Sequence, residues 1–239
     1  RVELEHVGLN HLTWERAVRV DGVDRLPELL EEQADWIAAD VGVPAALLRT
    51  LGAVPSHYLR YYYETSRVLG EQRRRPARAE QVMAIERELL ELYRDPALDE
   101  KPALLERRGG AFYSEAAAAL IASLHAGTGD VQVVDVRNDG ALPGLPDDAV
   151  VEVPARVDAA GARPLPQAPL APELLGLVQQ AKAYERLAVQ AAVRGDRAVA
   201  LKALLANPLV REYQVAVPLL DALLAKSRPW LPRFFPDGS

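Results

Sequence analysis

A short window of strand-type residues interrupts a sequence whose apolar residues otherwise follow a helical period. Between residues 130 and 158, two valine-rich runs (131–136 and 150–153) flank the turn residues Asn138-Asp139-Gly140. Residues 156–158 are expected to extend the second strand beyond Pro154. Because the other segments read as helices, we expect one α+β domain over residues 1–239, mostly helical with a small antiparallel sheet.

The helical segments are predicted from apolar spacing and from residues that start or stop helices. The strongest stripe, Val82, Ile85, Leu89 and Leu92, follows the basic stretch 73–78. Ser114 is expected to cap a helix over 115–125, and Gly195 to end a long helix over 173–194. The opening 7–14 reads as extended, and a loose tail is expected after the last helix. Further helices are expected at about 25–37, 44–51, 57–69, 197–206 and 215–226.

Composition excludes several classes of function. The 239 residues contain no cysteine, so disulfides, cysteine-based zinc sites and a cysteine nucleophile are impossible within them. The net charge of -6 argues against a nucleic-acid or anionic-membrane partner. No apolar run reaches the roughly 18 residues that a membrane-spanning helix needs. A small anionic substrate stays compatible, since a local basic pocket fits inside an acidic protein.

Seven short segments occur in an order that is typical of one enzyme family. They are GLNHL (8–12), VPSHYLRYY (54–62), RGGAFYS (108–114), NDG with LP (138–140 and 145–146), VEVP (151–154), YERL (184–187) and NPL (207–209). Together they cover nearly the whole chain. The sequence resembles the family 4 glycosidases, an NAD-dependent group that contains 6-phospho-β-glucosidases and 6-phospho-α-glucosidases.

This resemblance implies that the chain corresponds to the C-terminal half of such an enzyme, with a fold like the C-terminal domain of lactate and malate dehydrogenases. The family's first half is a Rossmann domain that binds NAD, and no G-x-G-x-x-G occurs here. The family also has a metal-binding cysteine upstream of GLNHL. We therefore expect the NAD site to lie outside this chain, and the isolated chain to be inactive.

The resemblance also implies roles for four residues. His11 binds a divalent metal, usually Mn²⁺, and Tyr58 is the base that removes the C2 proton after NAD has oxidised C3 of the sugar. Arg78 binds the 6-phosphate, and Asn10 orients His11 or contacts the sugar. On pattern alone, His11 is more typical of a hydrogen-bonded structural histidine, since a single histidine without partner ligands does not make a metal site. Arg78 is on pattern equally typical of a solvated surface arginine. His6, His57 and His125 show no functional pattern, and Glu152 is expected to be structural.

The resemblance favours a 6-phospho-β-glucosidase that hydrolyses phosphorylated disaccharides or glucosides in the cytoplasm as a homodimer or homotetramer. One alternative is a non-catalytic oligomerisation or interaction domain. Another is the C-terminal domain of a related 2-hydroxy-acid dehydrogenase, which the aromatic run 58–62 disfavours. The aglycone and the exact phospho-sugar are left open by the sequence.

Overall fold

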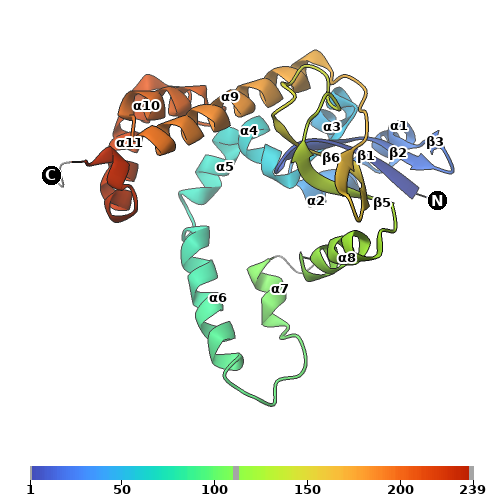
Figure 1. Ribbon diagram of the computed structural model, residues 1–239, viewed down its shortest axis with the longest axis horizontal. Coiled ribbons are helices and arrows are strands. Elements are labelled where there is room, and N and C mark those ends of the chain that lie inside the picture. Colours follow the sequence, from blue (N-terminus) through green and yellow to red (C-terminus); the bar gives the residue numbers. More distant parts are fainter. Residues whose placement is uncertain (1, 110–112, 237–239) are drawn as a thin grey trace. The chain divides into compact units, whose positions relative to one another are not determined.

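The computed structural model describes residues 2–109 and 113–236 (Figure 1). The chain divides into two compact units, which are described separately. The first contains residues 1–63, 133–155 and 164–239, and the second contains residues 64–132 and 156–163. Helices and antiparallel strands make up both, so the α+β class expected from the sequence is confirmed. None of the helices in the described ranges has the length and apolar character needed to cross a membrane.

The sheet of the first unit is built on an antiparallel hairpin formed by the segment that we expected to be extended. The hairpin pairs β1 (Val2–Leu9) with β2 (Leu12–Val20). The other strands are β3 (Val23–Asp24), β4 (Val54–Pro55), β5 (Asp130–Arg137) and β6 (Val150–Asp158). The strand order is β3-β2-β1-β6-β5, and β4 pairs with β2. The predicted extension of the second valine-rich strand through residues 156–158 is confirmed, because β6 includes them.

Three helices at the C-terminal end of the first unit lie together in Figure 1. They are α9 (Pro172–Arg194), α10 (Arg197–Ala206) and α11 (Tyr213–Ser227), close to their predicted bounds. Gly195 ends α9 with a φ of 69°, as expected from glycine's tolerance of left-handed backbone. The shorter helices of this unit are α1 Leu26–Glu32, α2 Ala34–Val41, α3 Ala45–Leu51, the 3₁₀ turn η1 His57–Leu59 and α4 Arg60–Tyr63.

Two expectations for the first unit were wrong. The single helix expected at 25–37 is broken at Gln33, which ends α1 and precedes α2 with a non-helical φ of -121°. Over residues 228–236 the tail is not loose, because it forms the 3₁₀ turns η2 (Arg228–Trp230) and η3 (Pro232–Phe234). Arg233 donates to the Val193 carbonyl, and its own carbonyl oxygen lies 1.9 Å from where a Cβ on residue 195 would be. The tail therefore packs against the end of α9.

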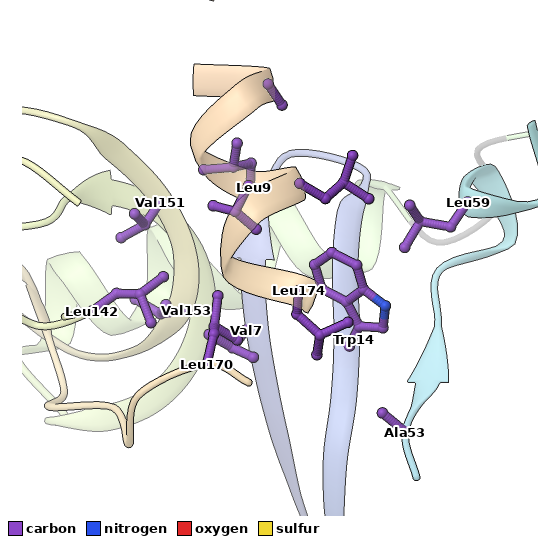
Figure 2. Packing of buried hydrophobic residues seen from close by; sticks show 13 residues of the cluster. Val7, Leu9, Trp14, Ala53, Leu59, Leu142, Val151, Val153, Leu170 and Leu174 are labelled. Carbon is purple, nitrogen blue, oxygen red and sulfur yellow. The ribbon is translucent and has the colours of Figure 1, made fainter. Parts of the chain in front are cut away.

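The main core of the first unit joins the hairpin, β6 and the start of α9 (Figure 2). Trp14 is fully buried, and Leu174 of α9 lies beside it in the figure. Leu59, which directly follows Tyr58, belongs to the same cluster. Burying each large apolar side chain contributes roughly 1.5–3 kcal/mol. This core fixes the hairpin turn, η1 and α9 relative to one another, and a second cluster packs α1, α2 and α3.

The second unit contains α5 (Thr65–Gln72), α6 (Arg78–Leu92), α7 (Leu104–Arg108) and α8 (Tyr113–Ala126), together with β7 (Gly161–Pro164). The expected helix over 57–69 is divided into η1, α4 and α5. Of the predicted α6 stripe, Ile85 and Leu89 are buried, whereas Leu92 is 44% exposed. Ser114 lies inside α8 and does not cap it, because the helix already includes Tyr113. Residues 110–112 of the RGGAFYS segment lie outside the described residues.

Candidate functional site

A cavity of about 280 Å³ lies beside the turn of the β1–β2 hairpin, within the first unit. Its lining comes from four places: the hairpin turn, the η1–α4 segment, α9, and the loop after α10. Most of the lining is aliphatic or aromatic, with a few polar side chains, which is the usual character of a small-molecule site. The polar lining residues are Asn10, His11, Tyr58, Tyr61, Tyr62, Tyr184, Glu185 and Asn207.

The hairpin turn presents Asn10 and His11 because the backbone before it approaches its partner strand very closely. Gly8 has a φ of 150°, and a Cβ at this position would lie 2.2 Å from the Leu12 carbonyl oxygen. Only glycine fits such an approach without displacing the strand. His11 itself has a φ of 62°, in the left-handed region that is uncommon for non-glycine residues. Strained positions of this kind often occur at functional sites.

Tyr58 is brought to the same turn by the pairing of β4 with β2. Pro55 pairs with Trp14, and the Ser56 N–H donates to the Thr13 carbonyl at 2.8 Å. The Tyr58 N–H donates to Ser56 Oγ at 3.3 Å, and the buried Leu59 anchors the turn. As a result the ring centroids of His11 and Tyr58 lie 4.3 Å apart, with 49° between their planes.

Three of the four predicted site residues therefore meet at one cavity. The Tyr58 side chain is 49% exposed, and its hydroxyl has no hydrogen-bond partner in the described part of the chain. Asn10 Nδ2 donates to Asp135 Oδ2 at 3.0 Å, so this amide is tied to β5. The roles assigned to Asn10, His11 and Tyr58 stay predictions, but their convergence is what those roles require.

The fourth predicted residue, Arg78, begins α6 in the second unit. Its guanidinium donates to the carbonyl oxygens of Arg107 and Arg108 at 3.0 and 3.3 Å. These bonds hold the last turn of α7, where carbonyl groups lack helical partners. The phosphate-binding role of Arg78 stays a prediction, since Arg78 also has this structural task.

Besides Tyr61 and Tyr62 of α4, three polar residues from α9 and the end of α10 line the cavity and were not assigned a role from the sequence. Tyr184 and Glu185 lie on α9, and Asn207 ends α10; we call them the polar trio. The YERL and NPL segments contain all three, so the resemblance marked these positions without indicating their function. Their convergence depends on the packing of α10 against α9, which no local pattern in the sequence reveals.

His6 is the other residue that the sequence analysis missed. Its Nδ1 lies 2.5 Å from Glu15 Oε1, and its Nε2 lies 3.0 Å from Glu152 Oε1. Burial lowers the pKa of His6, but the hydrogen bonds and charges of Glu15 and Glu152 outweigh it and raise the pKa to about 9. A protonated His6 therefore connects β2, β1 and β6 at neutral pH. The strand-borne Glu152 is structural, as expected.

This cluster predicts a loss of stability in mild alkali. The pKa of His6 rises from 6.5 to about 9 on folding, so protonated His6 stabilises the fold fully below pH 6.5. That contribution, up to about 3 kcal/mol, is lost as pH rises through about 9. Urea unfolding between pH 6 and 10 should show this decline, and His6→Gln should flatten it. His125→Gln, at an exposed position on α8, is the matched control. Identical pH slopes in the parent and His6→Gln would contradict the assignment.

His11 fits one ligand position of a metal site. Its ring nitrogens have no hydrogen-bond partner among the described residues, and an accessible neutral imidazole is a common metal ligand. Across residues 2–109 and 113–236, however, no group of three or more His, Cys, Asp or Glu side chains could hold a metal ion. The metal-binding role of His11 therefore stays a prediction, and the described residues alone do not form a metal site around it.

Comparison with known proteins identifies the relatives of this chain. It is 39% identical over 246 residues to a probable 6-phospho-beta-glucosidase of Bacillus subtilis, covering 98% of this chain and 56% of that protein. It is 34% identical over 232 residues to the 6-phospho-beta-glucosidase BglT of Thermotoga maritima, covering 96% and 55%. The chain thus spans about half the length of the relatives it matches.

A solved structure supports the same relationship. It is the Thermotoga maritima 6-phospho-beta glucosidase with manganese, NAD⁺ and glucose-6-phosphate, which superposes with a TM-score of 0.88 at 34% identity. The match covers 96% of this chain and 55% of that one. Residues 6–210 match the family 4 glycosyl hydrolase C-terminal domain. The chain belongs to glycosyl hydrolase family 4 and corresponds to the C-terminal part of its members.

Proposed function

We propose that this chain is the substrate-binding, C-terminal part of a 6-phospho-β-glucosidase. The whole protein would hydrolyse phosphorylated glucosides by NAD-dependent oxidation at C3, removal of the C2 proton and elimination of the leaving group. The observation that carries this proposal is the pairing of His11 and Tyr58, whose rings lie 4.3 Å apart on the lining of one cavity. We propose a preference for β-glucosides over α-glucosides because the two relatives named above are 6-phospho-beta-glucosidases.

When bound, NAD and manganese would supply the chemistry that side chains cannot: NAD would take and return a hydride at C3, and manganese would hold the sugar hydroxyls. His11 would provide one of the metal ligands. Tyr58 would accept the C2 proton as a general base, which requires that its hydroxyl be free to approach the sugar. Its exposure and its lack of a hydrogen-bond partner in the described residues meet that requirement. Asn10, held by Asp135, would contact a sugar hydroxyl.

Assays of the whole protein test this proposal. Release of p-nitrophenol from p-nitrophenyl β-glucoside 6-phosphate should depend on both NAD and Mn²⁺. Removal of either, by dialysis or chelation, should abolish it, and the unphosphorylated glucoside should be a poor substrate. The chain of residues 1–239 alone should release nothing. Cleavage that is independent of NAD would overturn the proposed mechanism. Activity of the isolated chain would overturn the expectation that the NAD site lies outside residues 1–239.

We also propose that the whole protein is a cytoplasmic homodimer or homotetramer. Support for self-association comes from α9, where Val189 and Val193, one turn apart, are 64% and 58% exposed. Exposed apolar residues at this spacing favour a helix–helix contact between copies. Light scattering of the purified protein measures its mass in solution, and a monomer at all concentrations would contradict the proposed self-association.

The proposed cytoplasmic location rests on the proposed phosphorylated substrate and on NAD, and cell fractionation tests this location.

A further inference from the structure

The hairpin turn that carries Asn10 and His11 has a conformation that its own sequence does not favour. The turn has two residues, because Leu9 pairs with Leu12, and of these two only His11 has a positive φ, at 62°. Two-residue turns that match the twist of the flanking strands have a positive φ at their first residue instead. A positive φ at the second residue usually calls for glycine or asparagine. A contact from outside the hairpin is therefore expected to hold the turn.

Asp135 of β5 supplies such a contact. Its Oδ2 accepts a hydrogen bond from Asn10 Nδ2 at 3.0 Å, and an ionised acceptor makes this bond stronger than one between neutral groups. In the sheet β6 lies between β1 and β5, so the bond reaches from the turn across one strand. Among residues 2–109 and 113–236, the Asp135 carboxylate makes no other hydrogen bond or ion pair. Within these residues it therefore acts on the turn alone.

The bond also fixes how the Asn10 amide is oriented. A carboxylate can only accept hydrogen bonds, so Asn10 has to turn its Nδ2 toward Asp135. Asn10 lines the same cavity as His11 and Tyr58, and its Oδ1 accepts no hydrogen bond in the described part of the chain. The oxygen is therefore the part of this amide that is available to a ligand. A sugar hydroxyl, which is able to donate, matches it.

We propose that Asp135 is a positioning residue of the site. Through Asn10 it holds the turn in the conformation that places His11 beside Tyr58, and it directs the Asn10 Oδ1 toward a hydroxyl of the reacting sugar. Asp135 does not line the cavity, so it acts on the substrate only through Asn10. Because both side chains are exposed, water competes with the bond, and its loss should weaken binding about ten-fold without abolishing it. This inference rests on the proposed function.

Two substitutions of Asp135 test the inference in the whole protein with NAD present. Asp135→Ala removes the acceptor, and it should weaken Mn²⁺ binding about ten-fold and raise KM for p-nitrophenyl β-glucoside 6-phosphate by a similar factor. The kcat should change little, because Tyr58 is untouched. Asp135→Asn keeps an acceptor oxygen and should stay close to the parent. Electron paramagnetic resonance measures the Mn²⁺ affinity without turnover.

Asp147→Ala is the matched control. Asp147 is an exposed aspartate in the loop between β5 and β6, and it does not line the cavity. Its replacement should leave KM and the Mn²⁺ affinity at the parent values. The thermal midpoint of each variant shows whether it is folded when its binding is measured.

Exchanging the two side chains tests which way the Asn10 amide faces. Asn10→Asp alone places two carboxylates together, so the hydrogen bond is lost and KM should rise. When Asp135→Asn is added, the amide at position 135 can donate to the carboxylate at position 10, which still offers an acceptor oxygen to the sugar. The double variant should therefore bind the substrate roughly five-fold better than Asn10→Asp does. If the Asn10 Nδ2 bound the sugar instead, the double variant would stay as weak as Asn10→Asp.

Weaker binding in Asp135→Ala, with retention in Asp135→Asn and recovery in the exchanged pair, supports the proposal. Parent values in Asp135→Ala overturn it. An equal loss in Asp135→Asn also overturns it, because the negative charge and not the hydrogen bond would then matter. A double variant that does not recover overturns the assigned orientation of the Asn10 amide. A parent protein that neither binds Mn²⁺ nor cleaves the substrate overturns the proposed function itself, and this result precedes any variant.

Discussion

Replacing Tyr58 by phenylalanine should lower kcat for leaving-group release by about 10²- to 10⁴-fold, the usual contribution of a general base. The hydroxyl that would accept the C2 proton disappears, while the ring that lies against His11 is kept. KM should change little, because phenylalanine preserves the shape of the cavity. Exchange of the C2 proton with solvent deuterium, followed by NMR, measures the affected step directly.

The design separates a chemical effect from a structural one. Tyr213→Phe changes an exposed tyrosine that does not line the cavity, and it should behave like the parent enzyme. Circular dichroism and the thermal midpoint should agree among the parent and both variants. If Tyr58→Phe still exchanged the C2 proton at the parent rate, Tyr58 would not be the base, and its contact with His11 would only be packing.

Replacing His11 by alanine should weaken Mn²⁺ binding to the whole protein by more than about 100-fold. Even the loss of an outer-shell partner of a ligand typically costs about 10- to 100-fold in metal affinity, and the loss of a ligand itself should cost more. The isolated chain should bind Mn²⁺ only weakly, since its described residues contain no group of three potential ligands. Titration of Mn²⁺ by electron paramagnetic resonance, which distinguishes free from bound metal, reports this without an activity assay.

A neighbouring histidine provides the control for this experiment. His57 is exposed, adjoins Tyr58 at a ring distance of 6.0 Å and does not line the cavity. His57→Ala should therefore keep the parent affinity for Mn²⁺. Unchanged affinity in His11→Ala would show that His11 is a structural histidine of the hairpin turn, which is the alternative that its sequence pattern allows.

The elements that local signals specify were predicted well. Gly195 and the apolar spacing before it located the end of α9, and α10 was placed at 197–206. The errors arose where local signals are weak or where tertiary contacts decide. Gln33 has no strong helix-breaking tendency, yet it separates two helices. The prolines of the tail predicted a loose end, but contacts with residues 193–195 order it.

The residues of the candidate site also differ in how far the sequence indicated them. Physical patterns in the sequence do not bring His11 and Tyr58 together, since 47 positions separate them in the chain; the family resemblance indicated both residues. The polar trio depends on the packing of α10 against α9, and the His6 cluster on the register of three strands. Such long-range convergence leaves no local signature, so only the structure reveals it.

The contact of Arg233 with Val193 and Gly195 anchors residues 228–236 to the C-terminal end of α9. The tail contacts the end of α9, the same helix that carries Tyr184 and Glu185, next to the helix that ends at Asn207. Anyone who attaches an affinity tag or a reporter domain should therefore preserve residues 228–236 and place the junction after them. A fusion made at the end of α11 would delete this contact, and the resulting loss of stability would be mistaken for a property of the fused partner.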